Sequence, residues 1–196
     1  MAYSDRVTSN RWSYLAAVLL LCTGCGTRQD STTAGRAGSA AESVQAQEIV
    51  VPEMGEPSSA LMAYFSGKES VKDLIEEWTD TDWVTTADDV MRHNLIPIRL
   101  LYMGKEGWVA ILHMRGSRSA SSNANLMHAR GQAILQLGVE GVLLASKREF
   151  SDEIAQGLYA MSPDDRRILI ALLDQAKRQH PDGEAQIERF RSQLPD

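Results

Sequence analysis

Residues 95–114 read LIPIRLLYMGKEGWVAILHM, and the fold class that the sequence predicts depends on this stretch. Two apolar runs with β-branched and aromatic residues, 95–103 and 108–114, flank a polar segment, 104–107, that begins and ends with glycine. Runs of this kind on either side of a glycine-containing turn favour a β-hairpin. Pro97 lacks the N–H group that a central strand donates, so its strand is expected at a sheet edge, or to begin near this proline.

The chain before this hairpin has the patterns of amphipathic helices. Ser70, with an aspartate three residues later, resembles a capping box and precedes apolar residues at helical spacing through Trp78. Thr86, with aspartates in the first turn, begins a second short helix that is expected to end at His93-Asn94.

The chain after the hairpin is mostly helical in pattern. Ser122 or Asn123 is a suitable N-cap for a helix that continues to Leu137, and residues 142–145 are a possible third strand. Ser151 is predicted to cap a further helix, and two more are predicted to begin at Ser162-Pro163 and after the break His180-Pro181-Asp182-Gly183. The sequence therefore predicts an α+β domain, with a small antiparallel sheet covered by several amphipathic helices and a helical C-terminal part.

The N-terminal residues have the layout of a secretory signal peptide. Basic residues precede an apolar run, 12–21, that is followed by small residues. A run of about ten residues is too short to cross a bilayer, which needs about 20. The segment is therefore interpreted as a targeting signal.

The end of this signal resembles the lipobox of bacterial lipoproteins, the motif that signal peptidase II processes. Thr23 and Gly24 lead into Cys25, while the expected leucine stands one place early, at Leu21, with Cys22 in its position. The resemblance implies that a diacylglycerol is attached to the Cys25 sulfur, that residues before it are removed and that the new amino terminus is acylated, for example by palmitate. A plain signal peptide with an accidental cysteine, or an uncleaved anchor, are the alternatives.

Three segments follow from this interpretation: a signal peptide, 1–24, a lipidated cysteine with a flexible tether, 25–59, and one globular domain, 60–196. From residue 26 to residue 59 the chain is rich in small and polar residues and has no aromatic residue, so it cannot bury enough apolar surface to fold alone. Residues 49–51, Ile-Val-Val, are the exception: they could add an edge strand, and the alternative that we favour is an apolar spot within the coil. Because Gly26 replaces the aspartate of the inner-membrane retention signal, the family rule implies the periplasmic face of the outer membrane rather than the inner membrane.

Charge and cysteine content limit the partners. The full chain has a formal charge of −6, and removal of the signal takes two basic residues and one acidic residue, which leaves −7. A chain this acidic has no electrostatic footprint for nucleic acid. Cys25 is then the only mature cysteine, so neither an intramolecular disulfide nor a cysteine-based metal site is expected.

A basic, hydroxyl-rich loop, residues 115–123, stands out in this acidic protein. On the helix after it, Arg130 falls inside the apolar stripe, four residues from both Leu126 and Ile134. An apolar stripe does not accommodate an unpaired guanidinium group. Arg130 is therefore expected either to extend to the edge of the stripe or pair with an acid, or to serve a ligand.

The ligand hypothesis assigns Arg130 and the loop to one cleft for an anion or a carboxylate, which the planar fork of arginine binds with two hydrogen bonds. The candidate residues are Arg115, Arg118, Ser119, Ser121, Asn123 and Arg130.

The same residues resemble, over about 25 positions, part of the OmpA-like peptidoglycan-binding domain, which has Gly-His-Thr-Asp at a strand end and an Asn-x-x-Leu-Ser-x-x-Arg-Ala-x-Ala helix after it. The positions that match are His113, Asn123, Leu126, Arg130 and Ala133. The positions that depart are Leu112, Arg115 and Met127. Arg115 replaces the aspartate that grips the diaminopimelate amine, so half of the ligand clamp is missing.

No catalytic motif is present in the sequence: there is no G-x-S-x-G, S-x-x-K, H-E-x-x-H, P-loop or G-x-G-x-x-G. We therefore expect no enzyme, no cofactor and no metal. The predicted function is a non-catalytic binding or assembly role of an anchored lipoprotein in an envelope complex for secretion, transfer or surface assembly, with an envelope protein as partner. A peptidoglycan-binding lipoprotein and an envelope enzyme of unrecognised type are the alternatives.

Overall fold

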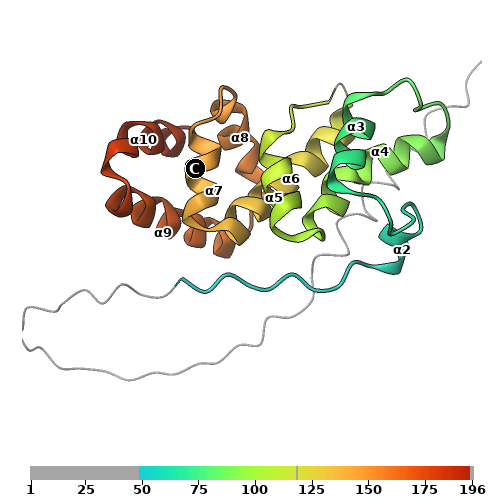
Figure 1. Ribbon diagram of the computed structural model, residues 1–196. Helices are drawn as coiled ribbons and strands as arrows, with labels where there is room; N and C mark the ends of the chain where they lie inside the picture. Colours follow the sequence, from blue (N-terminus) through green and yellow to red (C-terminus); the bar gives the residue numbers. More distant parts are fainter. Residues whose placement is uncertain (1–48, 118, 195–196) are drawn as a thin grey trace, which may run out of the picture. The chain divides into compact units, whose positions relative to one another are not determined.

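The computed structural model describes residues 49–117 and 119–194, and in these residues every regular element is a helix (Figure 1). The elements are α2 (Ser59–Met62), α3 (Val71–Thr79), α4 (Ala87–Leu101), α5 (Gly104–His113), α6 (Ala120–Leu137), α7 (Val139–Ser146), α8 (Ser151–Gly157), η1 (Leu158–Ala160), α9 (Pro163–Gln179), η2 (Pro181–Gly183) and α10 (Glu184–Ser192). The predicted α+β class is therefore wrong, and the described part of the chain is an all-α domain. The predicted signal peptide, Cys25 and Arg118 lie outside the described residues.

The predicted hairpin is a pair of helices, the C-terminal half of α4 and all of α5. Tyr102 and Met103 make the corner between them, and the glycine-bounded segment 104–107, with Gly104 at φ 69°, is the first turn of α5. A short apolar run has the same composition in a buried strand and in a buried helix, so composition does not distinguish the two. Both runs are helical because they are buried against other helices: α4 packs on α3, α5 and α6.

Pro97 lies inside α4 rather than at a strand edge, and α4 continues well past His93, where the helix was expected to end. A proline in a helix removes one backbone hydrogen bond and costs about 3 kcal/mol. Ile96 and Leu100 are fully buried on the same helix. Burial of two such side chains contributes about 3–6 kcal/mol, which outweighs the cost of the proline.

The possible third strand is also helical and forms half of α7. Gly138, at φ 62°, separates α6 from α7. Gly141 allows the two helices to approach closely, since a Cβ atom there would lie 2.7 Å from the carbonyl oxygen of Ile134. The glycines that suggested a strand boundary therefore make a tight corner between two helices.

Several helix starts are confirmed. Ser70 and Thr86 accept hydrogen bonds from backbone N–H groups three residues on, and an aspartate completes each capping box. Ser162 caps α9, with Pro163 at its first position. These signals depend on residues within one turn of each other, so they were predicted correctly although the fold class was not.

Two starts differ from the prediction. The N-cap of α6 is Ser119, whose hydroxyl accepts from the N–H of Ser122, so neither Ser122 nor Asn123 is the cap. The N-cap position of α8 is Phe150, and Ser151 is the first helical residue.

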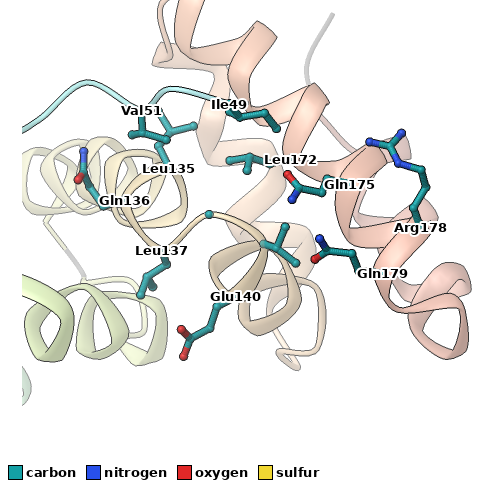
Figure 2. Close-up of a pocket in the computed structure, with 12 residues that line it drawn as sticks. Ile49, Val51, Leu135, Gln136, Leu137, Glu140, Leu172, Gln175, Arg178 and Gln179 are labelled. Atoms are coloured by element: carbon teal, nitrogen blue, oxygen red, sulfur yellow. The ribbon is translucent and has the colours of Figure 1, made fainter. Parts of the chain in front are cut away.

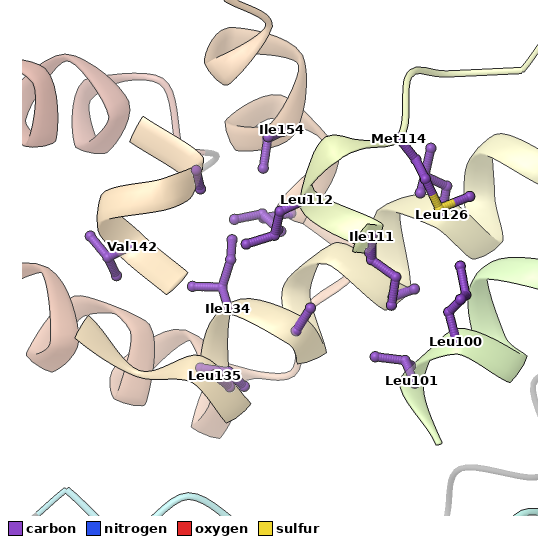
Figure 3. Packing of buried hydrophobic residues seen from close by; sticks show 14 of the residues in the cluster. Leu100, Leu101, Ile111, Leu112, Met114, Leu126, Ile134, Leu135, Val142 and Ile154 are labelled. Atoms are coloured by element: carbon purple, nitrogen blue, oxygen red, sulfur yellow. The ribbon is translucent and has the colours of Figure 1, made fainter. Parts of the chain in front are cut away.

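The core is organised around α6, which packs against α4, α5, α7, α8, α9 and η1. Figure 3 shows side chains of α4, α5, α6, α7 and α8 converging on one another. Leu126, Ala133 and Ile134 of α6 have no exposed surface. Because α6 is enclosed by so many neighbours, its burial extends beyond one stripe. No described helix is long and apolar enough to span a membrane.

Arg92 of α4 joins the first helices to the core. Its guanidinium group makes two hydrogen bonds to the carboxylate of Glu77, at 3.0 and 2.8 Å, and donates a third to the carbonyl of Tyr64. It also stands 3.5 Å from Glu69. Burial alone would raise the pKa of Glu69, but the N–H of Ser66 and then Arg92 lower this pKa to about 2.

The close packing of α4 on α5 predicts that Gly107→Ala destabilises the domain. Alanine is normally the better helix former, by about 1 kcal/mol. Here its Cβ atom would lie 2.0 Å from the carbonyl oxygen of Leu100, so the two helices must separate. We expect a net loss of about 1–3 kcal/mol in the free energy of unfolding, measured by urea denaturation. Gly55→Ala, where no atom lies within 4 Å, is the control, and an equal effect of both changes would contradict this packing.

The lowered pKa of Glu69 predicts a pH-dependent contribution to stability. The folded-state pKa, about 2, lies below the ordinary value of 4.5, so the ionised carboxylate stabilises the fold above pH 4.5 and loses this effect as the pH falls towards 2. Glu69→Gln should therefore lower the melting temperature near neutral pH. The difference in melting temperature from the wild type should become smaller as the pH falls from 4.5 towards 2. Glu76→Gln, which removes the same charge from an exposed position of α3, is the control. A Glu69→Gln effect that does not change with pH would contradict the assignment.

Candidate functional site

Arg130 lies in the middle of α6 and has no exposed surface. Its Nη1 donates to Oε1 of Glu153 at 3.0 Å, and its Nη2 donates to the carbonyl oxygen of Met114 at 2.5 Å. The Cζ atom stands 5.3 Å from the centre of the Phe150 ring. Burial lowers the pKa of the guanidinium group, and Glu153 opposes this shift. Arg130 is thus paired with an acid, and its guanidinium group is turned into the protein.

The backbone that Arg130 holds belongs to the loop between α5 and α6. Trp78 of α3 donates its Nε1–H to the carbonyl oxygen of Arg115 at 3.0 Å. The side-chain amide of Asn123 makes two hydrogen bonds to the backbone of Ser117, each of 2.6 Å. Arg130, Trp78 and Asn123 therefore satisfy three consecutive parts of one loop.

Arg115 and Arg130 are each paired with an acid. The side chain of Arg115 is 74% exposed and pairs with Glu149 at 3.2 Å, and both guanidinium groups lie near the Phe150 ring. Arg118 lies outside the described residues. The structure thus places Asn123 and Arg130 beneath the same loop, where both bind protein atoms.

The strand that the OmpA-like motif requires is absent from the described residues, because His113 is the last residue of helix α5. Its ring contacts Arg148. Burial lowers the pKa of His113, and the positive charge of Arg148 lowers it further. The spacing of the motif is present, but the arrangement of a strand end facing a helix is not.

A polar network inside the first half of the domain has the residue types of a catalytic site. The Nδ1 atom of His93 lies 3.2 Å from the Oγ atom of Ser122, which donates to Asn94 at 2.5 Å. The His93 ring stacks on Trp78, with the ring centres 4.7 Å apart. His93 and Ser122 are buried, so neither can contact a substrate in this structure. Among the described residues, no three His, Cys, Asp or Glu side chains are placed to hold a metal ion.

A cleft of the described domain lies at the corner of α6 and α7, facing α9, and has a volume of about 610 Å³ (Figure 2). We call it the strap cleft, because an extended segment of the chain, residues 49–54, lies against it; we call this segment the strap. The lining residues are Ile49, Val51, Leu135, Gln136, Leu137, Gly138, Val139, Glu140, Leu172, Gln175, Arg178 and Gln179.

The strap is held by alternate residues. Ile49 and Val51 pack against the core, whereas Val50 between them is 75% exposed. The side-chain amide of Gln136 donates to the carbonyl oxygen of Pro52 at 2.9 Å. Residues 49–51 are thus not an edge strand: they are an extended segment without regular secondary structure that packs against helices.

The wall of the strap cleft on α9 is polar and reaches the solvent-exposed surface. Gln175 and Gln179 reach into the cleft from this side (Figure 2), and Arg178 stands next to them. None of the three side chains has a hydrogen bond or ion pair to another described residue. Glu140, on α7, is already paired with Lys105 at 2.6 Å. The cleft therefore combines an apolar floor with hydrogen-bonding groups that are available to a ligand.

Sequence reasoning missed the strap cleft, because its lining comes from three separated segments. The one signal in the sequence was the apolar triplet at residues 49–51 within a polar segment. Comparison with known proteins adds no family: no protein-family model, no curated protein and no solved structure matches the chain.

The contacts of Arg130 predict how two substitutions act on stability. Arg130→Leu removes the donor to the buried carbonyl of Met114, which should cost about 1–3 kcal/mol of unfolding free energy. Glu153→Ala leaves a fully buried guanidinium group without a carboxylate and should cost about 3–5 kcal/mol. Chemical denaturation of each variant gives these values.

Glu149→Ala is the matched control for Glu153→Ala, since it also removes a carboxylate that pairs with an arginine. The Arg115–Glu149 pair is exposed on both sides, so its loss should cost less than about 1 kcal/mol. If the two alanine variants had the same stability, or if Arg130→Leu were neutral, Arg130 would not be the structural group described above.

Proposed function

We propose that this chain is a membrane-anchored lipoprotein of the bacterial envelope, with a non-catalytic role in binding or assembling an envelope complex. The anchor is the lipid on Cys25, and the location is the periplasmic face of the outer membrane. The domain binds a partner protein at a surface that the anchor presents to the periplasm.

The support for the anchor is the order of residues at the N-terminus: basic residues, the apolar run 12–21, then Thr23-Gly24-Cys25. One acyl chain holds a protein to a membrane only marginally, at about 0.8 kcal/mol for each buried methylene group, whereas several chains anchor it stably. From Cys25 to the strap at Ile49 the chain spans at most about 80 Å when fully extended, which permits binding at a distance from the membrane.

The observation that carries the binding role is the strap cleft itself. It already holds a length of extended polypeptide, by two apolar side chains and one hydrogen bond from Gln136. Its wall on α9 has further hydrogen-bonding side chains, Gln175 and Gln179, that the strap does not use. A surface with these properties is suited to holding a protein segment.

Labelling with radioactive palmitate tests the anchor. The wild-type chain should incorporate label and fractionate with the outer membrane, whereas Cys25→Ser should do neither, because its hydroxyl group replaces the thiol that accepts the lipid. Cys22→Ser is the matched control and should remain labelled. Label that persists in Cys25→Ser and disappears in Cys22→Ser would show that the other cysteine is modified, and the absence of label from the wild type would reject the proposal.

A further inference from the structure

We propose that the strap cleft binds an extended, acidic segment of a partner protein, which lies beside the strap and continues along α7. This inference rests on the proposed binding role and names the chemistry of the partner. Four features of the described residues support it: the binding mode of the strap, its unpaired backbone, the free side chains of α9 and the local charge.

The strap shows how the cleft holds an extended chain. In an extended chain successive side chains point to opposite sides, and in the strap Ile49 and Val51 face the protein while Val50 faces outwards. The floor beneath them is apolar, with Leu135 and Leu172. Another chain with apolar residues at alternate positions meets the same floor in the same way.

The backbone of the strap is open on its free edge. The backbone groups of residues 49–51 make no hydrogen bond to the backbone of another described residue. The next residue, Pro52, accepts a hydrogen bond at its carbonyl oxygen from the side chain of Gln136. Unpaired N–H and C=O groups of an extended segment are a template for a second extended segment, which pairs with them. The cleft volume of about 610 Å³ next to Ile49 provides room for such a segment.

The side chains of Gln175 and Gln179 provide hydrogen-bonding groups for the second edge of the incoming segment. A glutamine amide offers both a donor and an acceptor, and a segment that leaves water must have both kinds of backbone group satisfied. The two glutamines are one helical turn apart on α9, so they lie on the same side of that helix. They can hydrogen-bond the edge of the incoming segment that faces away from the strap.

A second hollow, of about 420 Å³, continues the strap cleft along α7 and shares Gln179 with it. Leu143 and Lys147 line this hollow and follow Val139 at intervals of four residues, so the three side chains form one stripe along α7. The combined surface is long enough for several extended residues, with an apolar floor that ends at a positive charge.

The charge of this surface favours an acidic segment. Arg178 and Lys147 have no ion pair with a described residue, while the carboxylates of the lining are Glu140, which pairs with Lys105, and Asp182. With Lys105 counted beside Glu140, three cations and two carboxylates stand at this surface, in a chain whose formal charge is −6. Carboxylates of a partner therefore meet unpaired cations here, which selects the partner and increases the rate of encounter.

The test measures the fluorescence anisotropy of labelled peptides with the purified full chain in detergent. The probe is the heptapeptide Glu-Val-Glu-Ile-Glu-Val-Glu, and its matched control is Lys-Val-Lys-Ile-Lys-Val-Lys. We expect the acidic peptide to bind at least about tenfold more tightly. The double change Gln175→Ala with Gln179→Ala should weaken its binding about tenfold, since each lost hydrogen bond contributes severalfold to affinity.

Arg178→Gln should weaken binding of the acidic peptide severalfold and reduce its dependence on salt, because a charge contact is lost. Arg167→Gln is the matched control on the same helix: this arginine pairs with Asp164 in the first turn, away from the cleft, and its loss should leave binding unchanged. None of the changed cleft side chains has a partner in the structure, so melting temperatures should stay within a few degrees of the wild type.

Equal affinity for the two peptides, or acidic-peptide binding that the glutamine and arginine variants do not affect, would overturn the inference. Dimerisation of the chain that depends on Gln175 and Gln179, without peptide binding, would also overturn it, because the occupant would be a second copy. These outcomes are independent of the lipid, since the peptides are measured in detergent solution. Palmitate labelling can therefore fail while peptide binding succeeds, and the reverse.

Discussion

The guanidinium group of Arg130 is the constraint around which the described domain is arranged. It is completely buried on α6, the helix that packs against most of the others. A buried charge is tolerated only when it is paired and hydrogen-bonded. Glu153 supplies the charge partner and the carbonyl of Met114 supplies the acceptor. The positions of α8, which carries Glu153, and of the end of α5 are therefore tied to one side chain.

This arrangement also explains the loop between α5 and α6. Its backbone turns from one helix to the next without regular hydrogen bonds, so its polar groups need partners from side chains. Arg130, Trp78 and Asn123 provide them from α6 and α3. Asn123 and Arg130, two of the residues that suggested a ligand site, thus bind the loop backbone, while Arg115 stands at the surface in an exposed ion pair.

The strap cleft has a different origin. Gly138 turns the chain sharply after α6, and Gly141 brings the first turn of α7 close to the end of α6. This corner cannot fill all the space in front of α9, and the strap covers part of what remains. The strap lies within the proposed tether, so whatever binds beside it is held by the same segment of chain that leads to the proposed anchor. A binding surface and an attachment point are in this way adjacent along the chain.

The sequence by itself determined the features that depend on neighbouring residues. The caps at Ser70, Thr86 and Ser162 are confirmed, and so is the break before α10, because a hydroxyl group, an aspartate or a proline acts within one turn of its own position. The pairing of Arg130 with an acid was one of its stated expectations, although the sequence did not identify Glu153.

Only the tertiary structure decided the class of the fold and the location of the cleft. The apolar runs that predicted a hairpin are compatible with a strand or a helix, and their burial against α6 on several sides selects the helix despite Pro97. The cleft is built from residues more than 80 positions apart, such as Ile49 and Leu135, whose contact leaves no local pattern. A capping hydrogen bond joins residues that are close in the sequence, so the local sequence predicts it. Burial depends on which distant segments pack together, so the local sequence does not predict it.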